Sequence, residues 1–243
     1  MDEIVLRGKR ALVTGAAARV GRAIAVELAR AGMNLAVHTR ATPADDALEE
    51  IRALGVSATV VRGDQSVDAA RIVSDAAAAL GGLDLLVCSA AAFGKVPAHD
   101  LDREAFDAML ASNLTGPFFL MQAAFRHLKV ARGSVVNLVD LCGTAQVWKG
   151  YAHYAAAKAG LATLTRLLAL EWAPEVRVNA VAPGVALYPD AEPDEERARV
   201  TRRIPLGHPG GPQDVARAVR FLACQPFITG QILTVDGGRS VNP

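Results

Sequence analysis

The sequence predicts a single α/β domain built on a doubly wound parallel sheet of about seven strands. Short apolar runs alternate with longer helical patterns, which is typical of strands covered by helices on both faces. The chain has 243 residues, 51% of them apolar, which is enough to bury one sizeable core. The strand-like runs are residues 11–13, 35–37, 58–61, 83–88, 134–139, 177–181 and 232–235.

Composition excludes several classes of function. The formal net charge is +1 and the charges are scattered, so we expect no nucleic-acid or membrane partner. Neither a signal peptide nor a run of about eighteen apolar residues is visible, which predicts a cytoplasmic protein. Cys88, Cys142 and Cys224 are odd in number and match no zinc spacing, and the five histidines show no metal-ligand pairing. We therefore expect small buried or half-buried cysteines and no metal.

The first strand leads into the segment TGAAARVGRAIAVELARAG, with a helix expected to begin near Val20. A strand, a small-residue turn and a helix form a dinucleotide-binding unit, in which backbone N–H groups at the helix start face a pyrophosphate. Gly15 and Gly21 permit close approach, whereas Arg19 replaces the usual middle glycine. The alternative is an ordinary tight turn between a strand and a helix.

The second strand is followed by His38, Thr39 and Arg40. An acidic residue here would bind the ribose hydroxyls of NADH, and none is present. Arg40 and Arg19 instead favour a 2′-phosphate, so the predicted cofactor is NADPH. Solvated surface arginines are the alternative interpretation.

The segment 135–160, VVNLVDLCGTAQVWKGYAHYAAAKAG, contains the predicted catalytic residues. An apolar run ends at Asp140, and a helix is expected to begin near Tyr151. Tyr154 and Lys158 then lie one turn apart on the same face of that helix. A phenol titrates near pH ~10 and needs a nearby cation to exchange protons at neutral pH, so we expect Lys158 to lower the pKa of Tyr154. A surface helix that merely carries Tyr and Lys is the alternative.

In a doubly wound sheet the ligand cleft lies at the carboxyl ends of the strands. We therefore expect the turn 14–21, Phe93, Asp140 and the loop at Gly184 on one rim, with Tyr154 reaching it from its helix. The polar stretch 185–204 follows the sixth strand and is predicted to be a lid over the substrate. An ordinary surface connection is the alternative.

Together these segments resemble the short-chain dehydrogenase/reductase family, with a Rossmann fold, over residues 9–239. Further matches are GDQSV (63–67), MLASNLTGPFF (109–119), RVNAVAPG (177–184) and ITGQILTVDGG (228–238). The resemblance implies that Asp64 touches adenine and that Asn113 orders a proton-relay water. It also implies that Tyr154 donates the proton while Lys158 binds the nicotinamide ribose. The implied cofactor-binding residues are Thr14, Gly15, Arg19, Val20, Gly21, His38, Thr39, Arg40, Asp64, Gln65, Ser89, Ala90, Tyr154, Lys158, Pro183 and Gly184.

Within that family the chain looks most like the pteridine reductases. Arg19, the pair His38 and Arg40, and Asp140 in place of the usual serine are the features that carry this likeness. In CSAAAF (88–93), Phe93 occupies the position of an aromatic ring that stacks on a pterin. The implied activity is hydride transfer from NADPH to a C=N bond of a dihydropterin or dihydrofolate. The implied substrate-binding residues are Arg19, Phe93, Asp140, Tyr154 and Leu187.

Some departures leave other readings open. Cys88, Ser89 and Ala91 differ from the pteridine pattern, and Asp140 lies one residue farther from Tyr154 than in close relatives. Asp140 is therefore either a pocket residue or a displaced loop carboxylate. A ketone-reducing relative, such as a 3-oxoacyl-carrier-protein reductase, is one alternative, and a non-catalytic NADP-binding regulator is another. The resemblance also implies a homotetramer that pairs helices around 102–127 and 151–173.

Overall fold

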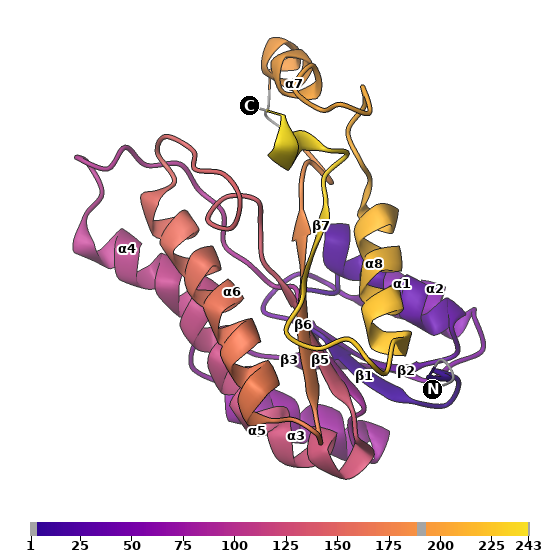
Figure 1. The fold of residues 1–243 in the computed structure, drawn as a ribbon. Helices are drawn as coiled ribbons and strands as arrows, with labels where there is room; N and C mark the ends of the chain where they lie inside the picture. The colour runs from indigo at the N-terminus through magenta and orange to yellow at the C-terminus, as the bar shows by residue number, and fades with distance from the viewer. Residues whose placement is uncertain (1–3, 189–192, 243) are drawn as a thin grey trace.

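Seven parallel strands form one sheet in the computed structural model, which describes residues 4–188 and 193–242. The strand order is β3-β2-β1-β4-β5-β6-β7, so the chain winds outward from β1 in both directions and the predicted doubly wound sheet is confirmed (Figure 1). The strands are β1 Arg10–Val13, β2 Asn34–Thr39, β3 Ala58–Arg62, β4 Leu85–Cys88, β5 Ser134–Leu138, β6 Arg177–Pro183 and β7 Ile232–Val235.

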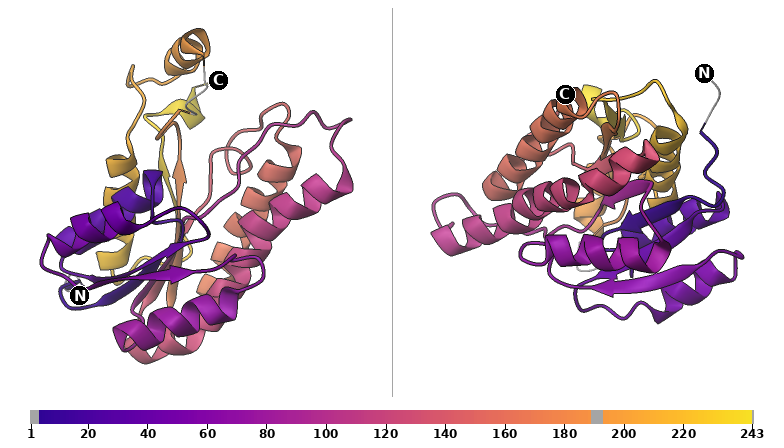
Figure 2. Two further views of the ribbon diagram at one scale, coloured as in Figure 1. Left: turned by 180° about the vertical axis from the view of Figure 1, so that it is seen from behind. Right: turned by 90° about the horizontal axis from the view of Figure 1, so that it is seen from below.

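Helices cover both faces of this sheet (Figure 2). On one face lie α1 Arg19–Arg30, α2 Asp45–Arg52 and α8 Pro212–Cys224. On the other lie α3 Ala69–Leu80, α4 Arg103–Leu110, α5 Gly116–Ala131 and α6 Ala152–Glu171. A short helix, α7 Asp194–Thr201, follows β6 and has no buried residue. No helix in the described ranges is long and apolar enough to cross a membrane.

The core consists of two apolar layers separated by the sheet. Leu35 and Val37 pack into the layer beneath α1 and α8, whereas Ala36 and Leu12 pack into the layer beneath α3 and α5. Neighbouring strand residues point to opposite faces, and both faces are covered. This is why the strands appear in the sequence as continuous apolar runs rather than as an alternating pattern.

Several boundaries differ from those expected. β2 continues past Val37 to Thr39, because the polar His38 side chain is buried and hydrogen-bonded there. The helical region expected at 102–127 is two helices joined by a π-helical turn, η1 Ala111–Thr115. The proposed lid 185–204 contains α7, and residues 189–192 of it lie outside the described residues.

Candidate active site

The predicted catalytic residues meet at the carboxyl edge of β5. Asp140 comes two residues after the end of β5, while Tyr154 and Lys158 lie one turn apart in α6. The Tyr154 hydroxyl donates a hydrogen bond to Asp140 Oδ2 at 2.9 Å, so Asp140 lies beside Tyr154 and is not a displaced loop carboxylate. Lys158 Nζ donates to the carbonyl of Leu138 at 2.8 Å and lies 5.6 Å from the centre of the Tyr154 ring.

A tight turn after Asp140 accommodates the extra residue before Tyr154. The backbone N–H of Cys142 donates to Asp140 Oδ1 at 2.8 Å, and the Thr144 hydroxyl donates to the Asp140 carbonyl. Gly143 has φ +93°, and a Cβ there would lie 2.4 Å from the carbonyl oxygen of Ala155 in α6. Only glycine fits this close approach, because a larger residue would push the loop off the helix.

Burial dominates the electrostatics of this group. The pKa of Asp140 is raised because the carboxyl is desolvated, despite its hydrogen bonds and the charge of Lys158. Burial lowers the pKa of Lys158 to about 8. Burial and the adjacent Asp140 raise the pKa of Tyr154 well above its usual range. The expectation that Lys158 lowers the pKa of this phenol is therefore wrong for this arrangement, and Tyr154 is a neutral proton donor at neutral pH.

Asn113 lies in the π-helical turn, a type of helical irregularity that is frequent at functional sites. Its Nδ2 donates to the carbonyls of Ala92 and Met109, at 3.1 Å each. Its Oδ1 is buried and has no hydrogen-bond partner in the described part of the chain. A buried acceptor without a partner is costly, so it offers a place for the predicted relay water, whose presence stays a prediction.

Three aromatic rings surround Tyr154, and we call them the aromatic wall: Phe93, Trp148 and Tyr151. Phe93 stacks on Tyr151 with ring centres 5.0 Å apart and meets Tyr154 edge-on at the same distance. Trp148 packs edge-on against Tyr151 at 5.8 Å. Phe93 is half exposed, as a substrate platform requires. Trp148 and Tyr151 were not predicted as site residues from the sequence, although three aromatic residues within 148–154 are unusual in a chain with 5% aromatic residues.

The C-terminal turn brings Arg239 to this wall. Arg239 begins a short 3₁₀ helix, η2 Arg239–Val241, and its Cζ lies 5.2 Å from the centre of the Trp148 ring. Gln146 Nε2 donates to the Arg239 carbonyl at 2.9 Å, which ties the turn to the loop after Asp140. Arg239 was missed because ninety-three residues separate it from Gln146, and no local pattern marks the contact.

The predicted cofactor turn is built by close backbone packing. Gly15 has φ +65°, and a Cβ there would lie 2.9 Å from Ala90 Cα. A Cβ on Gly21 would lie 2.2 Å from the Gly15 carbonyl oxygen. The buried Thr14 hydroxyl accepts hydrogen bonds from the N–H groups of Ser89 and Ala90, both at 2.9 Å. These contacts join the end of β1 to the end of β4.

Helix α1 presents an open N-terminus beside this turn. Its N-cap Ala18 forms no side-chain cap, no acidic residue lies in its first turn, and Val20 is its second residue. Arg19 is exposed and has φ +53°, the left-handed region that glycine usually occupies. Free N–H groups and an exposed guanidinium suit a phosphate. The residues present therefore fit the pyrophosphate of a dinucleotide.

At the ends of β2 and β3, the predicted residues have two kinds of role. His38 is buried. Its Nδ1 accepts a hydrogen bond from the Gly15 N–H at 3.4 Å, and its Nε2 donates to the Gly63 carbonyl at 3.0 Å, so the side chain links the cofactor turn to the end of β3. Buried Thr39 donates to Thr42. Arg40 is exposed and pairs with Asp64 at 3.2 Å. Hydrogen bonds from Ser66, with the charge of Arg40, lower the pKa of Asp64.

The remaining predicted residues lie on the same rim. Gln65 is buried, and its amide donates to the carbonyls of Ala90 and Ser112, so in this structure its side chain is a structural link. Pro183 ends β6, and a Cβ on Gly184 would lie 2.8 Å from Asp236 Cα. Leu187 is partly exposed in the segment that leads to α7.

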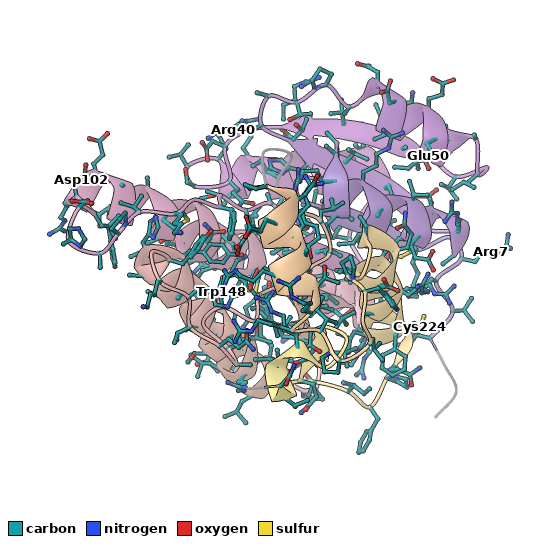
Figure 3. The ribbon with its side chains drawn as sticks, turned by 90° about the horizontal axis from the view of Figure 1, so that it is seen from above. Arg7, Arg40, Glu50, Asp102, Trp148 and Cys224 are labelled. Carbon is teal, nitrogen blue, oxygen red and sulfur yellow. The ribbon has the colours of Figure 1, made fainter. Side chains whose placement is uncertain are left out.

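Helix α7 lies over the carboxyl ends of the strands when the molecule is seen from above (Figure 3). The Tyr188 hydroxyl donates to the Arg197 carbonyl at 3.1 Å, which anchors the helix to the preceding segment. The Glu196 pKa is lowered chiefly by its hydrogen bond to Arg199, and also by the charges of Lys95 and Arg239. The role of this segment as a lid over the substrate stays a prediction.

The cysteines fit the sequence prediction, since Cys88, Cys142 and Cys224 are free and buried. Burial raises the pKa of the Cys142 thiol to about 11, so it is uncharged beside Asp140. Over the described ranges, no three His, Cys, Asp or Glu side chains gather in an arrangement that would hold a metal ion.

A doubly wound sheet with a glycine turn and a Tyr-Lys pair defines a nicotinamide-dependent oxidoreductase. Residues 15–240 match the family described as enoyl-(acyl carrier protein) reductase. The chain belongs to the short-chain dehydrogenase/reductase family.

Similar proteins span nearly the whole chain. The chain is 40% identical to cis-4-hydroxycyclohexanecarboxylate dehydrogenase of Sinomonas cyclohexanicum, over 94% of this chain and 95% of that protein. It is 34% identical to 3-oxoacyl-[acyl-carrier-protein] reductase of Rickettsia bellii, over 97% and 98%. The crystal structure of a dehydrogenase/reductase from Sinorhizobium meliloti 1021 superimposes with a TM-score of 0.90 at 34% identity, over 96% and 95%.

Proposed function

We propose that this protein is an NADPH-dependent reductase that interconverts a ketone and a secondary alcohol. The observation that carries the proposal is the 2.9 Å hydrogen bond from Tyr154 to Asp140, with Lys158 one turn behind the phenol. The similar proteins support this choice, since one is named for an oxo group and another for a hydroxyl group. They favour the ketone alternative over the pterin reaction suggested by the sequence motifs.

A bound nicotinamide supplies hydride to the carbonyl carbon. Tyr154 donates its proton to the carbonyl oxygen, and its raised pKa keeps the phenol protonated at neutral pH until the oxygen gains negative charge from hydride transfer. Without substrate the single hydroxyl proton points to Asp140, so the hydroxyl turns from Asp140 to the carbonyl oxygen before the proton is transferred. The Lys158 ammonium stabilises the phenolate that forms when the proton leaves, because the buried charge is weakly screened.

The preference for NADPH is inferred from charge. Arg19 and Arg40 are exposed at the cofactor turn, and neither β2 nor the loop after it presents an acid before Asp45. In this structure Arg40 is paired with Asp64 at 3.2 Å, an exposed contact that a 2′-phosphate can replace at little cost. We therefore expect a higher kcat/KM with NADPH than with NADH.

Pterin reduction is a second candidate, favoured by the position of Asp140. A carboxyl can bind an amide and an exocyclic amine together, which a serine hydroxyl cannot. Phe93 supplies a half-exposed ring edge-on to Tyr154, and Arg19 lies at the cofactor turn. In this reading Phe93 stacks on the pterin ring and Leu187 contacts its side chain.

The deciding experiment is a set of initial rates of NADPH oxidation by the purified protein. The substrates are acetoacetyl thioester and cyclic ketones on one side, and 7,8-dihydrobiopterin, 7,8-dihydromonapterin and dihydrofolate on the other. Turnover of ketones alone supports the proposal, whereas turnover of pterins alone replaces it with the second candidate. Tight NADPH binding without any turnover would instead favour a regulator.

We further infer a homotetramer from the outer faces of α5 and α6. Phe119, Leu167 and Leu170 are exposed there, with Leu170 at 79%. Exposed apolar side chains on adjacent helices favour pairing across a two-fold axis. Light scattering of wild-type protein should give about four times the 25.4 kDa chain mass, and Leu170→Glu should lower that mass.

A further inference from the structure

Arg239 is a largely buried cation whose guanidinium has no hydrogen bond to the described residues. Its side chain is only 9% exposed. Within residues 4–188 and 193–242, its guanidinium forms no hydrogen bond and no ion pair, and its one contact of this kind is with the face of Trp148, at 5.2 Å from Cζ. Guanidinium is always charged and has five N–H donors. None of its nitrogens is fully buried without a hydrogen-bond partner, so the guanidinium can be reached from solvent. The side chain is otherwise enclosed, and a charge in such a place is weakly screened. The site is therefore suited to an anion from outside the described chain.

The neighbouring carboxylates are engaged elsewhere. Asp140 uses Oδ1 for the Cys142 N–H and Oδ2 for the Tyr154 hydroxyl. Asp236 uses Oδ1 for the Gly238 N–H at 2.9 Å and Oδ2 for the Ser240 N–H at 2.6 Å. Burial and the charge of Arg203 lower the pKa of Arg239. The charges of Asp140 and Asp236 raise that pKa, although neither carboxylate is hydrogen-bonded to the guanidinium. The charge balance around Arg239 therefore leaves room for another negative group.

Two segments hold Arg239 in place before any ligand arrives. The hydrogen bonds of Asp236 fix the turn, which needs glycines at 237 and 238 with φ +64° and +87°. From the other side, Gln146 donates to the Arg239 carbonyl, and Trp148 Nε1 donates to Gln146 Oε1 at 3.4 Å. A preorganised guanidinium loses little entropy on binding. These hydrogen bonds therefore fix the backbone at Arg239 in the position from which its guanidinium can bind an anion.

We propose that Arg239 binds the carboxylate of the substrate, and that the aromatic wall packs on a ring between this carboxylate and the reacting carbonyl. The substrate class is then a cyclic oxo or hydroxy carboxylic acid, and the inference rests on the proposed function. The planar fork of arginine matches a carboxylate with two parallel hydrogen bonds. Phe93, Trp148 and Tyr151 present faces and edges that suit a compact ring. Tyr154, edge-on to Phe93, then meets the carbonyl at the far side of that ring.

The test compares 4-oxocyclohexanecarboxylate with its methyl ester, which keeps the ring and the carbonyl but lacks the charge. Wild-type protein is expected to reduce the acid with a kcat/KM at least ten times that of the ester. Arg239→Met keeps length and apolar contact with Trp148, and should lower kcat/KM for the acid about 30- to 150-fold, mainly through KM. The ester should lose much less, so that the preference for the acid disappears. Arg239→Lys should recover part of the rate with the acid.

Arg203→Met is the matched control, because it removes one positive charge from an exposed position near the same turn. It should change kcat/KM for the acid by less than about threefold, since exposed charges are screened. Equal acid and ester rates in wild type, or equal losses on both substrates in Arg239→Met, would overturn the proposal. Melting temperature and NADPH affinity of each variant show whether it is folded.

A binding experiment separates this proposal from the proposed function. Cyclohexanecarboxylate cannot be reduced, so its calorimetric titration into NADPH-saturated protein measures the anion site alone. Binding that is at least tenfold tighter than that of cyclohexylmethanol, and is lost in Arg239→Met, supports the site even where no ketone is turned over. Ketone turnover without any preference for the anion would instead keep the proposed function and remove this inference.

Discussion

The two rims of the cleft differ in what fills them. The cofactor rim, formed by Gly15, Arg19, Gly21, His38 and Arg40, is made of closely packed backbone with its charges exposed. The substrate rim, formed by Phe93, Asp140, Trp148, Tyr154 and Arg239, buries charged groups among aromatic rings. Function at the cofactor rim should therefore be most sensitive to changes of side-chain size, and function at the substrate rim to changes of charge and hydrogen bonding.

The largest expected effect removes the proton donor from the substrate rim. Tyr154→Phe deletes the hydroxyl that contacts Asp140 and leaves the ring packed. We expect kcat for ketone reduction to fall about 10³- to 10⁴-fold while NADPH affinity stays within about threefold. Stopped-flow rates and NADPH fluorescence titration measure the two quantities.

Thr163→Val is the control, since it removes a hydroxyl from an exposed position of the same helix, where the hydroxyl donates to the Ala159 carbonyl. Its kcat should stay within about fivefold of wild type. A rate for Tyr154→Phe near that of the control would mean that the protonating group is another residue.

The next effect tests shape on the cofactor rim. In Gly21→Ala the new methyl group would lie 2.2 Å from the Gly15 carbonyl oxygen, so α1 must move away from the turn. Overpacking of this kind costs about 1–3 kcal/mol. We expect a lower melting temperature and NADPH binding weaker by about 10- to 100-fold.

Gly94→Ala makes the same substitution in open space, because no heavy atom of the described chain lies within 4 Å of its added Cβ. NADPH affinity and melting temperature should match those of wild type. If Gly21→Ala also bound NADPH normally, the turn 14–21 would not be the cofactor site.

A smaller effect concerns the exposed charges of the cofactor rim. Arg40→Met removes a guanidinium that is 76% exposed and paired only with Asp64. We expect kcat/KM to fall about 10- to 50-fold with NADPH and to change less than about threefold with NADH. Arg30→Met, at the far end of α1, removes the same charge and should leave both values unchanged. A loss shared equally by NADPH and NADH would show that Arg40 does not read the 2′-phosphate.

The two rims also differ in how well the sequence predicts them. The glycine turn and the Tyr-Lys spacing follow from local patterns, because each is confined to a few consecutive residues. The sequence indicated that Asp140 lies beside Tyr154, and the hydrogen bond between them is present, but Gly143 in the turn between them was not noticed. Arg239 and Trp148 meet only because β7 closes the sheet beside β6. A contact across so many residues has no periodic signature.

The pKa expectation for Tyr154 failed for a related reason. Spacing along α6 correctly put Lys158 on the same face as the phenol, but it carries no information about burial. Desolvation and Asp140 together decide the proton affinity of Tyr154. Burial depends on the packing of Met109 and the aromatic wall around it, which only the folded chain reveals.

The smallest effect near neutral pH is a pH dependence that follows from Lys158. Burial lowers its pKa from the usual 10.5 to about 8, so the ammonium is present below pH 8 and is lost above it. Without that charge the phenolate formed from Tyr154 is less stable, and kcat should fall by up to tenfold per pH unit above pH 8.

The same group also affects stability. The unfolded lysine keeps its proton until about pH 10.5, so between pH 8 and pH 10.5 the unfolded state binds more protons than the folded state. The free energy of unfolding contributed by this group therefore rises with pH, by up to about 3 kcal/mol, while activity falls.

Rates and urea unfolding measured from pH 6.5 to 10 on wild type and Lys158→Met give the pH dependence of activity and of stability. Lys158→Arg keeps its charge throughout, so its profile should show no inflection near pH 8, whatever its absolute rate. An inflection that persisted in this variant would assign the titration to another group. Buried charge at Lys158 would then not control the reaction at the substrate rim, and this difference between the two rims would be lost.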